Sequence, residues 1–353
     1  MNPLRSHFYK KFLKQERPRH RFLAVTFLLI GMVTVLGAVA LIFYFNRSRL
    51  PEGQTPQWGI TFSRKYSEEL GLPWQVVYLA SLDDLGARRL RIPAYWNEIE
   101  PIPGLYDFAA LDWMLDHAAS RNAQVIIAAG LRLPRWPECH PPYWLAGLPD
   151  QARHDALLNY LRAVIERYRA NPALIYWQIE NEPFLDTFGK CPPTDSDLLR
   201  QEVGLARTLD PRHEVIITES GELASWIRGA QYADILGISL YRTVWNEYFG
   251  FFHWPLPSWY YRKKAELTLN QTLQDVIISE IQLEPWTNVP MVELPIKEQR
   301  NILSQAQFKS TIQYARDTGF SELYLWGIEW WYYMKLHGHP EYWDEGKHAI
   351  RNH

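Results

Sequence analysis

Residues 177–183 read Trp-Gln-Ile-Glu-Asn-Glu-Pro, an aromatic and aliphatic run that ends in Asn-Glu-Pro. The first part predicts a buried β-strand, and the proline ends it because proline cannot extend the ladder of a central strand. A second stretch, residues 275–282, reads Asp-Val-Ile-Ile-Ser-Glu-Ile-Gln and places Glu280 after another β-branched run. Two glutamates at predicted strand ends, Glu182 and Glu280, indicate acid–base chemistry.

The chain between residues 57 and 326 alternates between strand-like and helix-like segments. Such alternation is typical of parallel β/α architectures, and eight strands can close a barrel. Strands are expected at 57–62, 90–93, 125–129, within 177–183, at 215–218, at 235–238, within 275–282 and at 323–326. Helices are expected at 74–85, at 107–121 with Asp107 as N-cap, around 157–168, and at 195–209, 223–227, 259–269 and 298–316.

A doubly wound open sheet is the alternative fold. That fold usually has a glycine-rich phosphate loop after its first strand, whereas this chain has Ser-Arg-Lys-Tyr at residues 63–66. We therefore expect an α/β fold, a (β/α)8 TIM barrel. Its functional face is the C-terminal end of the strands, where both glutamates fall.

Residues 22–45 are 24 consecutive residues without a charge. A helix of this length, at about 1.5 Å per residue, crosses the roughly 30 Å hydrocarbon core of a bilayer. Seven Lys and Arg precede it in residues 1–21, and only Arg47 and Arg49 follow it closely. The positive-inside rule then places the N-terminus in the cytoplasm.

The sequence thus predicts a single-pass protein of the cell membrane with its barrel outside the cytoplasm. Residues 1–21 form the cytoplasmic tail, 22–45 the signal-anchor helix, 46–56 a tether and 57–353 the barrel domain. A cleavable signal peptide is the alternative, because Ala38-Val39-Ala40 resembles a cleavage site.

Residues 50–353 hold 28 of the 37 Lys and Arg and 38 of the 39 acids, a balance of −10. An acidic domain without a basic run argues against a nucleic-acid partner. The histidines form no His-Glu-x-x-His motif and no His-x-His after the first strand, so neither a metal nor another cofactor is expected.

Further residues suited to sugar chemistry stand at the predicted strand ends, namely Arg91, Asn181, Tyr241 and Trp326. Hydrolysis of a glycosidic bond needs one carboxyl to protonate the leaving oxygen and a second to attack or to activate water. An arginine and a tyrosine hydroxyl beside Glu280 would hold it ionised, and Glu182 could keep its proton.

These strand ends resemble those of the retaining glycoside hydrolases of clan A, the cellulase-like (β/α)8 barrels. The resemblance rests on Asn181-Glu182-Pro183, Ser279-Glu280, Leu90-Arg91-Ile92-Pro93 and Trp326. The segment 96–108, which contains Trp96-Asn97-Glu98-Ile99-Glu100-Pro101, is similar to the strand-two loop of the beta-galactosidase and xylanase-like members.

The resemblance implies a role for each of these residues. Glu182 would be the general acid/base, Glu280 the nucleophile and Asn181 the donor to the sugar 2-hydroxyl. Arg91 and Tyr241 would support the nucleophile, and Trp326 would be the platform beneath the sugar. Two departures leave the subfamily and the sugar unassigned: residues 125–130 have no histidine, and Ser239 replaces the histidine commonly found two places before the tyrosine.

Several alternatives stay open from the residues alone. Glu180 stands two residues before Glu182, so in a regular strand both side chains point to the same face, and Glu180 could be the acid instead. Gln282 and Glu284 compete with Glu280 for the strand end. Arg91 could be a structural ion-pair partner, and Tyr241 and Trp326 could be core. Four tryptophans in loops after strands three, six and eight could stack on further sugars or simply pack: Trp136, Trp245, Trp330 and Trp331.

Cys139 and Cys191 are the only cysteines, and they follow predicted strands three and four. Neighbouring loops in an oxidising compartment favour a disulfide between them, which requires Cα atoms within about 7 Å.

The expected activity is that of a membrane-anchored retaining β-glycoside hydrolase that cleaves O-glycosidic bonds of an extracytoplasmic glycan by double displacement. Its expected partners are an oligo- or polysaccharide and, through residues 22–45, the lipid bilayer. A transglycosylase that remodels surface polysaccharide and a catalytically silent glycan-binding barrel are the alternatives. Sequence does not settle the sugar, the linkage, or endo against exo action.

Overall fold

The computed structural model describes residues 17–46, 55–246, 250–269 and 273–351. The chain divides into two compact units, residues 1–49 and 50–353. The predicted segments 1–21 and 46–56 fall largely outside the described residues.

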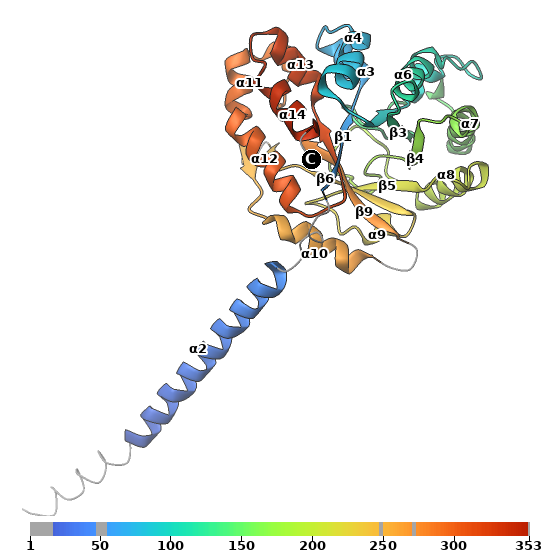
Figure 1. Ribbon diagram of the computed structural model, residues 1–353. Helices are drawn as coiled ribbons and strands as arrows, with labels where there is room; N and C mark the ends of the chain where they lie inside the picture. Colours follow the sequence, from blue (N-terminus) through green and yellow to red (C-terminus); the bar gives the residue numbers. More distant parts are fainter. Residues whose placement is uncertain (1–16, 47–54, 247–249, 270–272, 352–353) are drawn as a thin grey trace, which may run out of the picture. The chain divides into compact units, whose positions relative to one another are not determined.

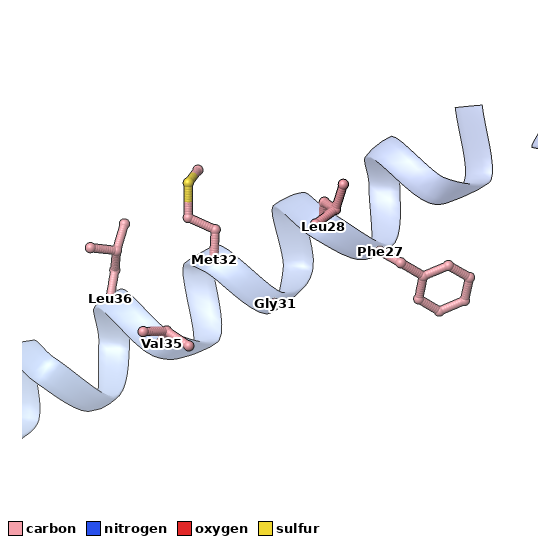
Figure 2. Close-up of a pocket in the computed structure, with 6 residues that line it drawn as sticks. All are labelled: Phe27, Leu28, Gly31, Met32, Val35 and Leu36. Carbon is pink, nitrogen blue, oxygen red and sulfur yellow. The ribbon is translucent and has the colours of Figure 1, made fainter. Parts of the chain in front are cut away.

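The first unit contains one long helix, α2 (Arg17–Asn46). Its segment Phe22–Ile42 has a mean hydropathy of 2.6, and none of the residues in its most apolar window is buried. Figure 2 shows six of its residues, Phe27, Leu28, Gly31, Met32, Val35 and Leu36, around a shallow apolar hollow. Length and composition allow this helix to cross a bilayer, although a signal sequence has the same properties.

The second unit is a closed barrel of eight parallel strands, with helices around its outside (Figure 1). Barrel strands that follow one another in the sequence pair with each other. The first strand also pairs with the last, in a register that sets Gln57 opposite Glu322, and this pairing closes the barrel. The predicted TIM barrel is therefore confirmed, with all eight strands in place: β1 (Gln57–Thr61), β2 (Arg89–Pro93), β3 (Gln124–Ala129), β4 (Leu174–Ile179), β5 (Val215–Ser220), β6 (Ile235–Leu240), β9 (Asp275–Gln282) and β10 (Glu322–Trp326).

The outer layer contains the predicted helices with shifted ends. These are α4 (Trp74–Ala80), which continues as a π-helical turn over Ser81–Leu85, α6 (Ala109–Ala119), α7 (Asp150–Tyr168), α8 (Ser196–Leu209), α9 (Ile227–Ala230), α10 (Ser258–Thr268), α11 (Ile296–Ile302) and α12 (Gln305–Asp317). Further elements were not predicted: α3 (Arg64–Glu69), α5 (Trp96–Ile99), α13 (Ile328–Leu336), α14 (Glu341–Arg351), two short 3-10 turns at Tyr143–Leu145 and Met291–Glu293, and the hairpin of β7 (Thr243–Asn246) and β8 (Gly250–His253).

Three helix predictions were wrong in detail, each for a local reason. The helix expected at 298–316 is two helices, because Leu303 is extended and Ser304 starts a new helix through a capping box with Gln307. The helix expected at 223–227 begins only at residue 227, because Trp226 has a left-handed φ of 71°. The N-cap of α6 is Phe108 rather than Asp107, although the Asp107 side chain accepts a hydrogen bond from the Ala109 N–H.

Alternate side chains of each strand point into the barrel and fill it. The inner layer consists of Ile126, Ile216, Ile235, Ile277 and Tyr324, all buried. Tyr324 fits because Gly59 faces it across the β1–β10 pair, where a Cβ would lie 2.5 Å from the ring. This apolar layer is the floor on which the polar residues of the strand ends rest.

Candidate active site

Glu280 faces the barrel mouth because β9 contains a β-bulge. Ile278 pairs with Ile238 of β6, but the next residue of β6, Ser239, pairs with Glu280. On the other side of β9, its pairing with β10 shows the same shift of register. Since Ile277 already points inward, a regular strand would turn Glu280 outward, and the extra residue reverses this.

The carboxylate of Glu280 accepts two hydrogen bonds, one from the buried Arg91 and one from the half-buried Tyr241. Arg91 Nη1 lies 2.6 Å from one oxygen and the Tyr241 hydroxyl 3.0 Å from the other. Arg91 comes from β2 and is fully buried, and its remaining nitrogens donate to Gln178 at 2.6 Å and to Asn181 at 2.7 Å. The guanidinium thus fixes Glu280 and Asn181 relative to each other.

Glu182 lies just beyond β4, in a left-handed turn with a φ of 43°. Its backbone N–H donates to the Thr218 hydroxyl at 2.7 Å, and its carboxyl accepts a hydrogen bond from Ser239 Oγ at 2.7 Å. Burial, followed by the negative charge of Glu280, raises the pKa of Glu182 to about 8. Glu182 therefore keeps its proton near neutral pH, and a proton donor stands close to an ion-paired carboxylate.

The side-chain amide of Asn181 links the two glutamates indirectly, through Arg91 on the side of Glu280 and Thr218 on the side of Glu182. Its oxygen accepts from Arg91 and, at 3.1 Å, from the Thr218 hydroxyl. Its nitrogen donates to Glu138 at 3.1 Å. These partners assign the orientation of the amide, with its N–H groups turned away from Arg91.

Glu180, the alternative acid, has a different role in the structure. Its left-handed φ of 58° interrupts the extended backbone, so its side chain does not follow the alternation that would point it the same way as Glu182. Its two carboxyl oxygens each lie 2.6 Å from a backbone nitrogen, those of Leu131 and Arg132. Burial raises the pKa of Glu180 to about 7. Glu180 thus holds the loop that follows β3.

Trp326 lies at the end of β10 and is only 6% exposed. Its indole nitrogen donates to Glu284 at 2.7 Å, and the guanidinium of Arg135 lies 4.0 Å from its ring centre. Arg135 also stacks on Tyr66 at 3.6 Å and pairs with both Glu284 and Glu329. One face of the Trp326 ring is therefore covered by Arg135, and Glu284 belongs to this cluster rather than to the catalytic pair.

The loop tryptophans separate into two groups. Trp136 is 53% exposed, and its ring lies 5.8 Å from that of Phe188. Phe188 contacts Trp286, which in turn lies edge-on to Tyr241 at 5.3 Å. These four rings form a row of aromatic contacts that leads from the surface to the partner of Glu280.

The other loop tryptophans do not join this row. Trp245 lies half-buried in β7, and no contact among the described residues joins it to Glu182 or Glu280. Trp330 and Trp331 lie in α13 and are fully buried, with their indole nitrogens bonded to Gln299 and to the Leu283 carbonyl. Of the two alternatives left open for Trp330 and Trp331, the structure shows packing, because the helix turns both side chains into the core.

Cys139 and Cys191 form a disulfide with Cα atoms 5.3 Å apart. The bridge joins the loop after β3, which carries Glu138, to the loop after β4. Among the described residues, no group of three or more His, Cys, Asp or Glu side chains could hold a metal ion.

Sequence reasoning missed five residues of this site: Gln178, Thr218, Ser239, Glu138 and Trp286. Gln178 and Thr218 carried a usable signal, because both are inward-facing residues near the ends of apolar strands. Ser239 was noted only as a departure from the family pattern. Glu138 and Trp286 stand in loops, where no periodicity marks them.

Residues 84–157 match the Glyco_hydro_42 family, described as beta-galactosidase. Among curated proteins, the beta-galactosidase BgaA of Clostridium cellulovorans is 27% identical over 126 residues, which cover 29% of this chain and 18% of that protein. This chain thus spans less than a fifth of the curated relative.

Solved structures match over most of the chain. They include a beta-galactosidase from the haloarchaeon Halorubrum lacusprofundi, with a TM-score of 0.57 and 15% identity over 83% of this chain and 57% of that one. GH5_18 from Bifidobacterium longum subsp. longum has a TM-score of 0.58 and 13% identity over 84% and 79%. A glycoside hydrolase family 5 mannosidase from Rhizomucor miehei has a TM-score of 0.54 and 14% identity over 78% and 82%.

These matches and the closed eight-stranded barrel agree with the resemblance found in the sequence: the chain has the (β/α)8 fold of the clan A glycoside hydrolases.

Proposed function

We propose that the protein is a membrane-anchored retaining β-glycoside hydrolase that cleaves O-glycosidic bonds of an extracytoplasmic glycan by double displacement. The observation that carries the proposal is the opposite environment of two neighbouring carboxyls. Glu280 accepts hydrogen bonds from Arg91 and Tyr241, whereas Glu182 has a pKa raised to about 8. A retaining mechanism needs one carboxylate as nucleophile and one carboxylic acid as proton donor.

In the first step an oxygen of Glu280 attacks the anomeric carbon. The bond from that carbon to the glycosidic oxygen breaks, and its electron pair goes to the leaving oxygen, which takes the proton of Glu182. Glu280 is then a glycosyl ester and Glu182 a carboxylate. Arg91 holds Glu280 in place during the attack, because its other nitrogens are anchored on Gln178 and Asn181.

In the second step a water molecule attacks the anomeric carbon, Glu182 takes a proton from it, and the ester oxygen returns to Glu280. Esterification of Glu280 removes a negative charge that raises the pKa of Glu182. The pKa of Glu182 therefore falls at the stage where it must act as a base.

The substrate contacts follow from the resemblance and from exposure. Asn181 binds the 2-hydroxyl of the sugar at the cleaved bond, and Trp326 lies beneath that sugar with the face that Arg135 leaves open. Trp136 contacts a further sugar, in keeping with its exposed ring. Trp245, on the hairpin of β7 and β8, contacts another.

The anchor is α2, whose apolar segment is long enough to span a bilayer. The excess of Lys and Arg before it supports an orientation with the N-terminus in the cytoplasm and the barrel on the outer side. A leader that is cleaved after export would give the same location for the barrel without the attachment.

The test uses the full-length chain in mild detergent with a panel of aryl β-glycosides. NMR of the first product, before mutarotation, should show the β-anomer. Glu280→Ala should abolish turnover of every substrate. Glu182→Ala should spare substrates whose leaving group needs no protonation, and added azide should restore its turnover by attacking the intermediate. Net inversion would reject Glu280 as nucleophile, and an active Glu280→Ala variant would reject the site.

A further inference from the structure

A third carboxyl, that of Glu138, reaches into the mouth beside the catalytic pair. It comes from the loop after β3, is 6% exposed, and accepts the hydrogen bond from Asn181 Nδ2 at 3.1 Å. The double displacement has no step for it. A buried carboxylate beside two others is costly unless it is paired with a cation or takes up a proton.

The position of Glu138 is built by the fold. It has a φ of 73°, its N–H donates to the Arg135 carbonyl at 2.8 Å, and its carbonyl accepts from the Leu133 N–H at 2.7 Å. Gly189 packs closely against Glu138, because a Cβ added to Gly189 would lie only 2.8 Å from the Cβ of Glu138. The next residue, Cys139, is covalently tied to the neighbouring loop. Two loops therefore hold Glu138 toward Asn181.

Two arginines of the mouth are already paired with other carboxyls. Arg91 is paired with Glu280, and Arg135 is paired with Glu284 and Glu329. The ion pairs of the described residues include none to Glu138.

The surroundings of Glu138 oppose its ionisation as well. Arg132 favours its ionisation, and Lys65 interacts with it more weakly, but neither forms an ion pair with it. The guanidinium of Arg132 donates to the Phe188 carbonyl, and the ammonium of Lys65 donates to the Trp136 carbonyl. Burial, and then the charges of Glu280 and Glu182, raise the pKa of Glu138 well above its usual range. A cation brought by the substrate would relieve this arrangement.

The sugar atom that faces Glu138 follows from the orientation of Asn181. The oxygen of this amide is taken by Arg91 and Thr218, and its N–H groups face Glu138. In the reaction proposed above, Asn181 binds the substituent at C2, beside the anomeric carbon that Glu280 attacks. Glu138 thus lies next to that substituent. A hydroxyl or an acetamide brings no charge there, whereas an ammonium brings a cation and three donors.

We propose that Glu138 selects substrates whose sugar at the cleaved bond is a 2-amino-2-deoxy sugar, by pairing its carboxylate with the protonated amine. This inference rests on the proposed glycosidase function and names the substrate class of the same site. Glu138 is a specificity-determining residue, while Glu182 and Glu280 carry the chemistry.

The test compares 4-nitrophenyl β-glycosides that differ only at C2, as amine, hydroxyl or acetamide, in both the gluco and galacto series. The full-length parent should prefer the amine over the hydroxyl in at least one series by about tenfold or more in kcat/KM, as for a buried charge pair. Glu138→Gln keeps the shape of the side chain and should bring this ratio to about one, while hydroxyl substrates change by only a few-fold. Glu322→Gln replaces another buried glutamate, at the start of β10 and at the opposite end of the strands from the mouth, and should keep the parent ratio.

The outcomes separate this inference from the proposed function. If the parent hydrolyses hydroxyl or acetamide glycosides but not the amines, the glycosidase function stands and the inference is overturned. It is also overturned if Glu138→Gln accelerates all substrates equally, since Glu138 would then only block the mouth.

A binding measurement covers the case in which no glycoside is hydrolysed. Calorimetry with Glu182→Gln compares a β-1,4-linked glucosamine hexamer with cellohexaose. Preferential binding of the amino oligomer, lost on adding Glu138→Gln, supports the selection while the hydrolase function fails. Equal binding of the two oligomers, or no binding, overturns the inference.

Discussion

Replacement of Ser239 by Ala should move the alkaline limb of the activity profile to higher pH. The hydroxyl of Ser239 donates to the Glu182 carboxyl at 2.7 Å, and this hydrogen bond lowers the pKa that burial and Glu280 raise. A donor stabilises the carboxylate more than the neutral acid. Its loss therefore raises the pKa of Glu182 further above about 8 and extends the pH range in which Glu182 can donate a proton.

The size of the shift follows from the contact. A hydrogen bond to a charged group contributes about 1.5–3 kcal/mol, and one pH unit corresponds to about 1.4 kcal/mol. These figures give an upper limit of about two units. Because the neutral carboxyl also loses part of its hydrogen bonding, we expect a shift of about one unit.

The assay is the pH dependence of kcat/KM for an aryl β-glycoside that needs leaving-group protonation, which reports the free enzyme. Ser81→Ala is the matched control, because Ser81 is also buried and its hydroxyl donates to the Tyr78 carbonyl at 2.6 Å, outside the mouth. Only Ser239→Ala should move the alkaline limb. A limb that stays in place or moves to lower pH, in a variant with an unchanged unfolding temperature, would refute the assignment of Glu182 as the acid.

Three further predictions concern stability and topology. The folding stability should decrease as the pH rises from about 5 to 8, because burial raises the pKa of Glu182 to about 8 and the pKa values of Glu219 and Glu329 to about 7. In this range the folded state keeps protons that the unfolded state has lost. Each group then lowers the free energy of unfolding by up to about 1.4 kcal/mol per pH unit. Burial lowers the pKa of His140 to about 4 and also lowers that of His253, and these two groups act in the opposite sense. They are outnumbered by the three carboxyls, so a higher unfolding temperature at pH 8 than at pH 5.5 would contradict the expectation. The variant Cys139→Ser should lose about 2–5 kcal/mol in denaturant unfolding, because the bridge spans 52 residues of chain; an unchanged midpoint would count against this contribution. Protease added to intact cells, or to spheroplasts if an outer membrane exists, should remove the barrel, whereas a barrel that survives while the tail is cut would show the reverse orientation.

The strands could be located from the sequence because strands of a parallel barrel are buried on both faces and appear as continuous apolar runs. The β-branched run before Glu280 and the run before Asn181 are such segments, and both lead to the mouth. The bulge in β9 could not be predicted from composition. The inward direction of Glu280 depends on one extra residue that only its two neighbouring strands reveal.

The loops account for most of what remained unpredicted. Glu138 is positioned by a left-handed turn, a close contact with Gly189 and a covalent bridge next to it. Ser239 was expected to be no more than a substitution for histidine, and only the geometry reveals its hydrogen bond to Glu182. Such contacts join residues that are distant in sequence, so local periodicity carries no signal for them.

The pairing of the first strand with the last has a consequence for biosynthesis. Glu329, just after β10, accepts a hydrogen bond from the backbone N–H of Ser63, 266 residues earlier, and pairs with Arg135. At about 5–20 residues per second, roughly 13–50 s separate the synthesis of these two ends. During that interval β1 has only β2 as a neighbour, and its other edge is an unpaired row of backbone donors and acceptors. The barrel can therefore close only after β10 has been synthesised.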